Sequence, residues 1–149
     1  MEYFAYQQKE FVYKYIVMLS DTDQFKHMSF ANYLRLMFLA TDALFTACLT
    51  PEFLAQRRLK VLNARFQFRK QSTSGDQLLV KVNASEIIRR QFSLLYTYVI
   101  EDTGELVGLG KQNVELLRLG TNLPEELLTS IQEVLSPILV SAEHLLYKY

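Results

Sequence analysis

Most side chains in this sequence that could do chemistry lie in one short polar segment, Asp21–His27 (DTDQFKH). The segment falls between a strand-like stretch and a strongly apolar, helix-like stretch. Backbone amides at the start of a helix lack intrahelical partners, and with the helix dipole behind them they can stabilise a developing oxyanion. A carboxylate beside such amides could attack a carbonyl carbon or activate a water to do so.

The sequence argues against several other kinds of site. Its five glycines are scattered, so none forms a phosphate-binding loop between a strand and a helix, and there is no Gly-x-Ser-x-Gly motif. Neither of the two histidines, His27 and His144, has a partner at metal-ligand spacing. Cys48 is the only cysteine, which excludes an internal disulfide and a cysteine-rich metal site. We therefore expect no metal or redox cofactor.

The elements around the polar segment follow from hydrophobic periodicity. Phe11–Leu19 alternates apolar and polar residues and is predicted to be a strand, followed by a loop over Ser20–Ser29. Phe30–Leu49 is apolar on most sides, which predicts a helix enclosed by other structure. Ser29 is predicted to cap it by accepting from an amide of the first turn, and Thr50-Pro51 to end it.

Four further strands and a C-terminal helix are predicted after Pro51. The strand segments are Leu62–Phe68, with Leu62, Ala64, Phe66 and Phe68 on one face, then Leu78–Glu86, Phe92–Ile100 and Leu106–Leu119. Glu101–Gly104 is a hairpin turn, while Gly108 and Gly110 indicate a bulge or a close backbone approach. The final helix begins at Pro124, with Glu125 and Glu126 in its first turn. Ser136-Pro137 interrupts this helix, and Ser136 caps a second segment.

This order of elements predicts a single α+β domain over residues 1–149. A strand, a buried helix and a four-strand meander give a curved antiparallel sheet wrapped around a central helix, with a C-terminal helical segment.

Composition narrows the class of protein. The chain of 149 residues is 50% hydrophobic, enough for one core, and its 16 basic and 16 acidic residues cancel. This balance argues against a general nucleic-acid binder. Leu34–Leu49 is interrupted by Arg35 and Asp42, so no membrane span is expected, and the first ten residues do not resemble a signal peptide. We expect a cytoplasmic protein.

Asp21–Leu36 (DTDQFKHMSFANYLRL) resembles the motif of hotdog-fold acyl-CoA thioesterases of the 4-hydroxybenzoyl-CoA thioesterase type. That family has an Asp-x-Asp pair, a short loop containing Gly or His, and a helix that opens with Asn and an aromatic residue. Gly75-Asp76 matches its Gly-Asp turn, and the resemblance covers about Phe11 to Pro124. Gly108–Gln112 is similar to the thioesterases of enediyne polyketide synthesis.

The resemblance implies hydrolysis of an acyl-CoA or acyl-carrier-protein thioester, with coenzyme A entering only as part of the substrate. It implies that the Asp23 carboxylate and the Phe30 backbone amide are catalytic, and it matches His27 to a histidine of the loop, which makes His27 a third candidate catalytic residue. It also implies a homodimer or homotetramer with sites at the subunit interface. Candidate substrate-binding residues are Asn32 and Tyr33, which open the helix, Lys26, where the family usually has glycine, and Arg89 and Arg90, for coenzyme A phosphates.

Each of these residues also has a structural interpretation. Asp23 could cap the local turn, Asp21 is expected to close the loop by accepting from backbone amides, and Lys26 could pair with Asp23. The Arg89-Arg90 pair could be a solvated rim, and His144 is expected to face solvent. Aromatic residues on the strands are expected in the core, although some could line an acyl tunnel: Phe66, Phe68, Phe92, Tyr96 and Tyr98.

Two other functions fit the same fold. A non-enzymatic acyl-binding protein would bind acyl-CoA saturably without turnover, and Lys26 in the glycine position favours it. A hydratase or dehydratase would need a histidine and an acid arranged around a carbon-carbon bond, for which His27 in this loop is a poor match. Hydration of an enoyl-CoA would identify that activity.

Overall fold

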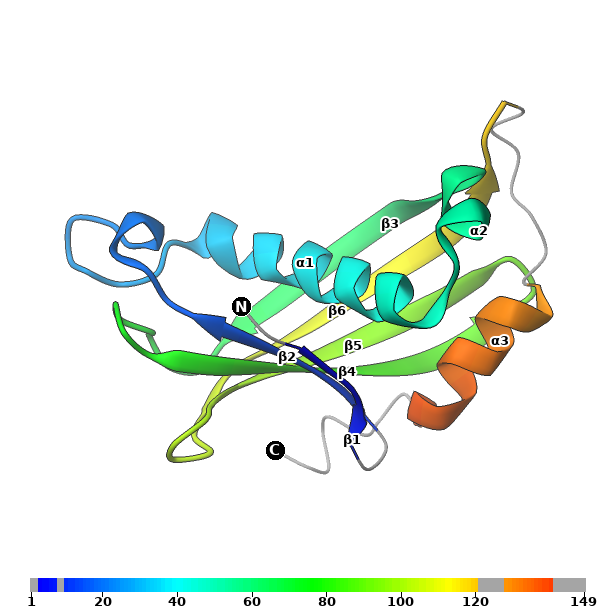
Figure 1. The fold of residues 1–149 in the computed structure, drawn as a ribbon. Coiled ribbons are helices and arrows are strands. Elements are labelled where there is room, and N and C mark those ends of the chain that lie inside the picture. Colours follow the sequence, from blue (N-terminus) through cyan, green and yellow to red (C-terminus); the bar gives the residue numbers. More distant parts are fainter. Residues whose placement is uncertain (1–2, 8–9, 121–127, 141–149) are drawn as a thin grey trace.

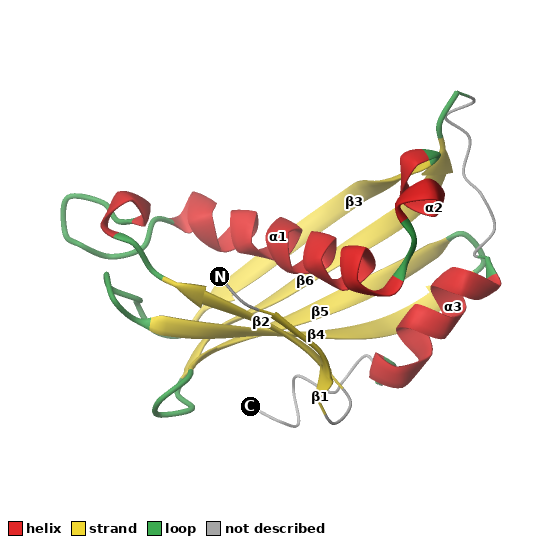
Figure 2. Cartoon of the chain, viewed as in Figure 1, coloured by secondary structure: helices red, strands yellow, loops and turns green. Residues whose placement is uncertain are grey.

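The computed structural model describes residues 3–7, 10–120 and 128–140 of the chain. These residues form one antiparallel sheet in the order β1-β2-β4-β5-β6-β3, with helix α1 lying across one face (Figures 1 and 2). The strands are β1 (Tyr3–Gln7), β2 (Glu10–Ile16), β3 (Arg57–Phe68), β4 (Gln77–Ile88), β5 (Gln91–Ile100) and β6 (Leu106–Arg118). The helices are α1 (Phe30–Cys48), α2 (Pro51–Ala55) and α3 (Thr129–Leu135), with short 3-10 turns η1 (Leu19–Asp21) and η2 (Ser136–Ile138). The predicted α+β class with a curved sheet around a helix is confirmed.

The order of strands in the sheet differs from the predicted four-strand meander. Only β4, β5 and β6 form a meander, while β3 pairs with β6 at one edge and β2 pairs with β4 on the other side. β1, which the periodicity did not predict, pairs with β2 at the second edge. Strand pairing between segments far apart in sequence decides this order, and periodicity within one segment carries no information about it.

Helix α1 begins at Phe30 as predicted and ends at Cys48, one residue early. The face that packs on the sheet is buried and includes Leu36, Met37, Ala40 and Leu44. The opposite side is open, and Phe38 is 45% exposed. The prediction of a helix enclosed on most sides is therefore wrong for a single chain, because one sheet covers one face.

Strand β3 starts five residues earlier than predicted and contains a bulge. Val61 pairs with Val114 and Asn63 with Asn113, so Leu62 is an extra residue without a partner on β6. An extra residue reverses which side chains face the helix. Leu59 and Val61 are half-buried before the bulge, whereas Leu62 is exposed and Phe66 is half-buried after it. The side chains that face the helix therefore change from odd-numbered to even-numbered positions at Leu62, so the predicted alternation does not extend through the first half of the strand.

Gly108 and Gly110 permit close packing against β6, as expected. A Cβ atom on Gly108 would lie 2.2 Å from Cζ of Phe66 and 2.9 Å from the Gln67 carbonyl oxygen. One on Gly110 would lie 2.3 Å from Cε of Met37 on α1. These two positions let an aromatic ring and the central helix approach the strand.

The C-terminal part departs from prediction in detail. Ser136 is the C-cap of α3 and opens the 3-10 turn η2 instead of capping a second α-helix. The Asn83 side-chain amide donates to the Ile138 carbonyl oxygen (3.2 Å) and holds this turn on β4. Pro124, Glu125, Glu126 and His144 lie outside the described residues. Helix α2, which Thr50 caps by accepting from the Phe53 amide (3.2 Å), was not predicted.

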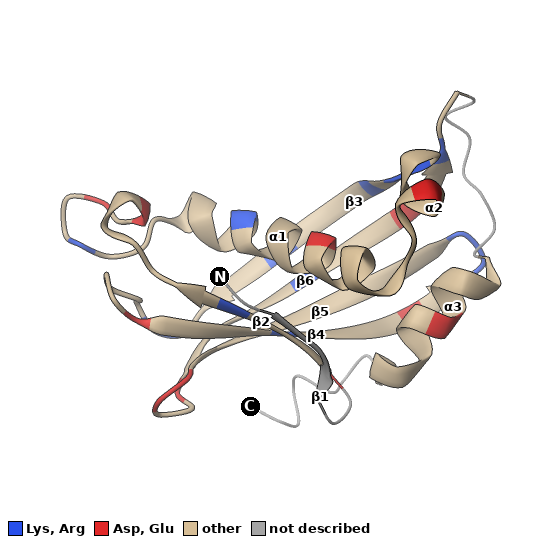
Figure 3. Cartoon of the chain, viewed as in Figure 1, with Lys and Arg blue, Asp and Glu red and all other residues tan. Residues whose placement is uncertain are grey.

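Charged residues of both signs are interspersed over the elements (Figure 3). Within the described part of the chain, no helix is long and apolar enough to cross a membrane.

Candidate active site

The loop between β2 and α1 is closed at its neck. Thr22 and Met28 face each other as an isolated antiparallel bridge, and the Ser29 amide donates to the Asp21 carbonyl oxygen (3.1 Å). Beyond the neck, the Asp23 amide donates to the His27 carbonyl oxygen (2.9 Å) and the Lys26 amide to the Asp23 carbonyl oxygen (2.9 Å). The polar segment is therefore an ordered turn at the start of α1.

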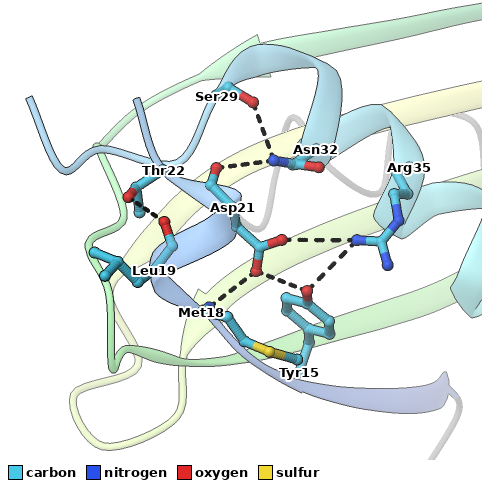
Figure 4. A network of polar contacts seen from close by, with 8 residues as sticks. All are labelled: Tyr15, Met18, Leu19, Asp21, Thr22, Ser29, Asn32 and Arg35. Carbon is cyan, nitrogen blue, oxygen red and sulfur yellow. Dashed lines mark hydrogen bonds and ion pairs between the residues drawn. The ribbon is translucent and has the colours of Figure 1, made fainter. Parts of the chain in front are cut away.

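Asp21 ties this loop to its surroundings (Figure 4). Its Oδ2 accepts from the Tyr15 hydroxyl (2.7 Å) and the Met18 amide (2.9 Å), while Oδ1 lies 3.8 Å from an Arg35 nitrogen. Its carbonyl oxygen accepts from the side-chain amide of Asn32 (2.8 Å). Asp21 is only 7% exposed, so the expected structural role is confirmed. Arg35, whose part in the network the sequence analysis missed, follows Asn32 by one helical turn.

The Asp23 carboxylate is exposed and also caps the turn. Its Oδ1 accepts from the amides of Phe25 (2.8 Å) and His27 (3.3 Å). Its Oδ2 makes no hydrogen bond or ion pair with a described residue. The turn holds one carboxylate oxygen and leaves the other available, so capping and chemistry are compatible at this residue.

Lys26 keeps the backbone shape that glycine would have in this loop. Its φ is +63°, in the left-handed region that glycine adopts at least cost. Among described residues, Lys26 forms no ion pair with Asp23, so the expected alternative of a charge pair is not observed. His27 is half-buried, its backbone forms a bridge with Thr73, and its imidazole has no described hydrogen-bond partner.

The start of α1 carries a free amide. Ser29 is the N-cap residue as predicted, but its hydroxyl accepts from the Asn32 side chain (3.0 Å) and makes no bond to a first-turn amide. No hydrogen bond joins the Phe30 amide to any described residue. A donor of this kind at the positive end of a 19-residue helix is suited to a developing negative charge.

Asn32 and Tyr33 are anchors in the folded chain. Asn32 donates both to Asp21 and to Ser29, as described above. Tyr33 is buried: its hydroxyl donates to Ser72 Oγ (3.0 Å) and accepts from the Ser72 amide (3.1 Å), and its carbonyl oxygen accepts from Tyr98 (2.6 Å). Burial raises the pKa of Tyr33, which keeps its hydroxyl neutral.

The family follows from the sequence. The sequence model of the Thioesterase-like superfamily matches residues 17–135, which is most of the chain and includes the loop Asp21–His27 and helix α1. The chain belongs to the thioesterase-like superfamily. Membership supports thioester hydrolysis as the general reaction of this thioesterase-like chain. No curated protein matches it by sequence.

Solved structures of hotdog thioesterases share the fold of this thioesterase-like chain. The dynemicin thioesterase aligns with a TM-score of 0.81 at 20% identity, over 89% of this chain and 99% of its own. A 1,4-dihydroxy-2-naphthoyl-CoA thioesterase from Synechocystis gives 0.77 at 19% identity, over 85% and 96%. A Staphylococcus aureus protein solved in complex with CoA gives 0.77 at 19%, over 89% and 85%. The hotdog resemblance read from Asp21–Leu36 is confirmed.

Aromatic side chains line the sheet next to the free amide. Phe30 lies 5.5 Å from Phe68 and 6.2 Å from Phe66 between ring centroids, and the Phe66 ring stacks on Tyr33 at 4.9 Å. Phe92, Tyr96 and Tyr98 are buried as expected, whereas Phe66 is half-buried and Phe68 is exposed. An apolar surface thus adjoins the loop at the start of α1.

Arg89 and Arg90 lie at the opposite end of the sheet from Asp23. The loop that bridges His27 leads into the start of β4, and the two arginines follow the end of that 12-residue strand, roughly 35 Å away. Both are exposed and line a shallow pocket with Glu86 and Asn113. Within one protomer the structure does not bring them together with Asp23.

A cavity of about 410 Å³ lies along the C-terminal half of α1, enclosed also by α2, β3 and β6. Gln112 lines it, only 1% exposed, and none of the predicted site residues does. The sequence contains a signal for this residue. The even-numbered positions from Leu106 to Leu116 are otherwise apolar or glycine, and Gln112 is the one polar residue among them. Among the described residues, no cluster of His, Cys, Asp or Glu could hold a metal ion.

Proposed function

We propose that this chain hydrolyses an acyl-CoA or acyl-carrier-protein thioester to the free acid and the thiol. The observation that carries the proposal is the unpartnered Phe30 amide at the start of α1, reached from a loop on which Asp23 keeps one carboxylate oxygen free. Solved neighbours that act on an acyl-CoA or hold CoA support coenzyme A as the carrier.

In the proposed reaction the Phe30 amide donates to the thioester oxygen and Asp23 supplies the attack. Asp23 either adds to the carbonyl carbon, to be released later by water, or removes a proton from the water that adds. In both cases the carbon–sulfur bond breaks, the acyl carbon gains a hydroxyl group and the sulfur leaves as the thiol. Asn32 holds the loop on the helix through the Asp21 carbonyl oxygen, and Tyr33 fixes the first turn of the helix to Ser72 and Tyr98. His27 and Lys26 belong to the same turn as Asp23 and are proposed to line the site with it.

The proposal includes a homodimer, or a dimer of dimers, joined through β3. This edge strand has β6 as its single described neighbour, and apolar side chains are exposed beside it. These are Phe30 and Phe38 on α1 and Leu62 and Phe68 on β3. Antiparallel pairing of two β3 edges would place the start of one strand beside the end of the other. Arg89 and Arg90 of one subunit would then lie at the same end as the second subunit's Asp23.

Substitution Asp23→Asn tests the chemistry. An asparagine oxygen can still accept from Phe25 and His27, so the loop is expected to keep its shape while the carboxylate is lost. We expect kcat for thiol release from a panel of acyl-CoAs to fall by about 10²–10⁴-fold. Asp102→Asn, in the exposed β5–β6 turn, is the matched control and should keep full activity. Equal rates for wild type and Asp23→Asn on every cleaved substrate would remove Asp23 from the reaction.

The same assay tests the arginine pair. We expect Arg89→Ala with Arg90→Ala to raise KM for acyl-CoA several-fold while leaving kcat unchanged, because uniform binding is lost without a change at the reacting carbon. The effect should shrink in high salt, which screens exposed charges. An unchanged KM would indicate that Arg89 and Arg90 are solvated surface residues that do not bind the substrate.

One observation favours the second candidate, an acyl-binding protein without turnover. Oδ1 of Asp23 is fully engaged in capping its own turn. In that case acyl-CoA would bind saturably and no thiol would be released, even with the protein in large excess.

A further inference from the structure

Strand β3 and the two residues that follow it carry a concentrated positive charge. Residues 57–70 contain six of the 16 basic side chains of this neutral chain and no acidic one: Arg57, Arg58, Lys60, Arg65, Arg69 and Lys70. Two of them are engaged within the molecule, since Arg57 lies over the Phe53 ring and Lys70 pairs with Glu105 (2.7 Å). The other four are exposed, and none of them forms an ion pair with a described residue.

This charge is not neutralised by the strands alongside. The residue opposite Arg65 on β6 is Lys111, and like charges at such a position destabilise a sheet. Lysines on the other strands each have an acidic partner: Lys14 with Glu101 (2.9 Å), Lys81 with Glu10 (3.6 Å) and Lys111 with Glu86 (2.9 Å). The exposed cations of β3 therefore form a surface that an anionic partner could neutralise.

The basic segment ends beside the loop that carries Asp23. Arg69 follows Phe68, whose ring centroid lies 5.5 Å from that of Phe30. Shortly after it, the Ser72 carbonyl oxygen accepts from the Met28 amide (2.8 Å). The end of β3 and the start of α1 accordingly lie at the same end of the molecule (Figure 1).

The loop at this end exposes apolar side chains as well. Leu19 and Phe25 are each 68% exposed, and Phe25 directly precedes the exposed Lys26. Apolar residues bordered by charged ones are typical of protein interfaces. The exposed cations extend from Arg58 to Arg69, about 35 Å along the strand, which is more than the phosphates of one coenzyme A molecule could cover. Both observations favour an acidic protein as the partner.

We propose that Phe25, Lys26, Arg65 and Arg69 form a docking surface for a small acidic carrier protein that presents the acyl thioester on a phosphopantetheine arm. That the cargo is a thioester rests on the proposed function, which left the carrier open. Opposite charges speed the encounter of two proteins, and the arm would then enter toward the Phe30 amide from the end where the carrier is bound. Coenzyme A contains the same arm, so acyl-CoA remains a substrate.

The proposed dimer leaves this surface available. Pairing of two β3 edges uses backbone groups, whereas docking uses side chains. Phe66 stacks on Tyr33 and so faces α1, which places Arg65 on the outer face of the sheet. The carrier would therefore bind around the end of β3, and an antiparallel dimer would offer one such surface at each end.

Binding of a loaded carrier tests the proposal without any turnover. The probe is a fluorescently labelled acyl carrier protein, loaded with the acyl group whose CoA thioester is cleaved fastest, or with octanoyl if none is cleaved. Its anisotropy is followed as the full chain is added. We expect Kd to rise at least about tenfold between about 50 and about 300 mM NaCl, because salt screens exposed charges. No binding of the carrier, or tighter binding of a single-stranded RNA or of phosphatidylglycerol vesicles, would overturn the proposal.

A double substitution then assigns the binding to this surface. Arg65→Gln with Arg69→Gln should raise Kd at low salt about fivefold. Thr129→Glu with Gln132→Glu changes the net charge by the same amount at exposed positions on α3, at the other end of the molecule, and should leave Kd unchanged. An unchanged Kd in the arginine variant, or an equal rise in both variants, would overturn the docking surface.

Turnover distinguishes docking from chemistry. The arginine variant should lose about fivefold in kcat/KM on the loaded carrier and keep its kcat/KM on the matching acyl-pantetheine, which has no protein surface. Equal losses on both substrates would contradict the proposal. If no thioester is cleaved at all, the proposed function fails while the binding results stand, so the two proposals fail separately.

Discussion

The two ends of helix α1 are held in different ways. At its start, a loop of polar residues is fixed by bonds to carboxylate and carbonyl oxygens, and the carboxylate proposed to react stays in solvent. Toward its end, the helix borders a mostly apolar cavity whose lining also includes Asp42, Arg57 and Arg58, and the buried hydrogen bonds there join the neutral side chains of Thr41, Tyr96 and Gln112. The difference is one of solvent access: the hydrogen bonds at the start of α1 leave a carboxylate in contact with water, whereas those further along the helix are buried between neutral side chains.

The largest effect on this comparison is expected from removing the Asp21 carboxylate, which holds the loop at the start of α1. Asp21→Ala would leave the buried Tyr15 hydroxyl and the Met18 amide without their acceptor. We expect the free energy of unfolding to fall by about 3 kcal/mol, mostly from these two bonds, because Arg35 is half-exposed and rehydrates. Urea denaturation measures it. Asp102→Ala is the control, expected within about 0.5 kcal/mol of wild type, and a similar small change for Asp21→Ala would show that the loop is held by other contacts.

Tyr96→Phe is the corresponding test at the apolar end. It removes the hydroxyl between Gln112 and Thr41, and we expect the free energy of unfolding to fall by about 2 kcal/mol. The difference in the free energy of unfolding between wild type and Tyr96→Phe should depend on pH. Because burial holds the pKa of Tyr96 and Tyr98 above the ordinary value, the unfolded chain ionises first, near pH 10. Stability is then constant below about pH 10 and falls above it, by about 1.4 kcal/mol per pH unit for each tyrosine.

Urea denaturation of wild type and Tyr96→Phe at about pH 8 and about pH 11 checks both parts of this expectation. The variant should lose less stability between the two pH values than wild type does. An equal alkaline loss in both proteins would mean that Tyr96 is not kept neutral by burial.

The smallest expected effect on stability comes from substituting Lys26 in the turn between Asp23 and His27. Lys26 adopts a left-handed conformation that glycine reaches without a clash, so Lys26→Gly should raise the free energy of unfolding by about 1 kcal/mol. Lys26→Ala removes the same charge but keeps the Cβ atom, and it should bring no gain. Thermal unfolding of both variants distinguishes them. A gain in the alanine variant would point to charge in place of backbone conformation.

Local signals in the sequence predicted what local physics determines. Alternation located β2, the polar segment located the loop, and α1 begins at Phe30 as expected. Asp21 was correctly assigned a structural role, although its carboxylate accepts from the Tyr15 hydroxyl and the Met18 amide, both of which precede it in the sequence. Whether Asp23 reacts stays a prediction, since geometry shows that it can but not that it does.

What the sequence did not predict depends on contacts between distant segments. The placement of β3 at the edge depends on its pairing with β6, and the bulge at Leu62 appears only in that pairing. Likewise, the hydrogen bonds around Gln112 involve Tyr96 on β5 and Thr41 on α1, so they form only when these elements pack together. No pattern within a single element contains these relations.

The bulge in β3 has a consequence for how this chain can vary. The first half of the strand presents Leu59 and Val61 to the cavity, and the second half presents Phe66 beside the free amide. One residue added or lost between them would exchange inner and outer side chains along one half. An insertion or deletion in the middle of this strand would therefore disturb the packing of one half, while substitutions on either side of Leu62 would act separately on the cavity and on the surface beside the Phe30 amide.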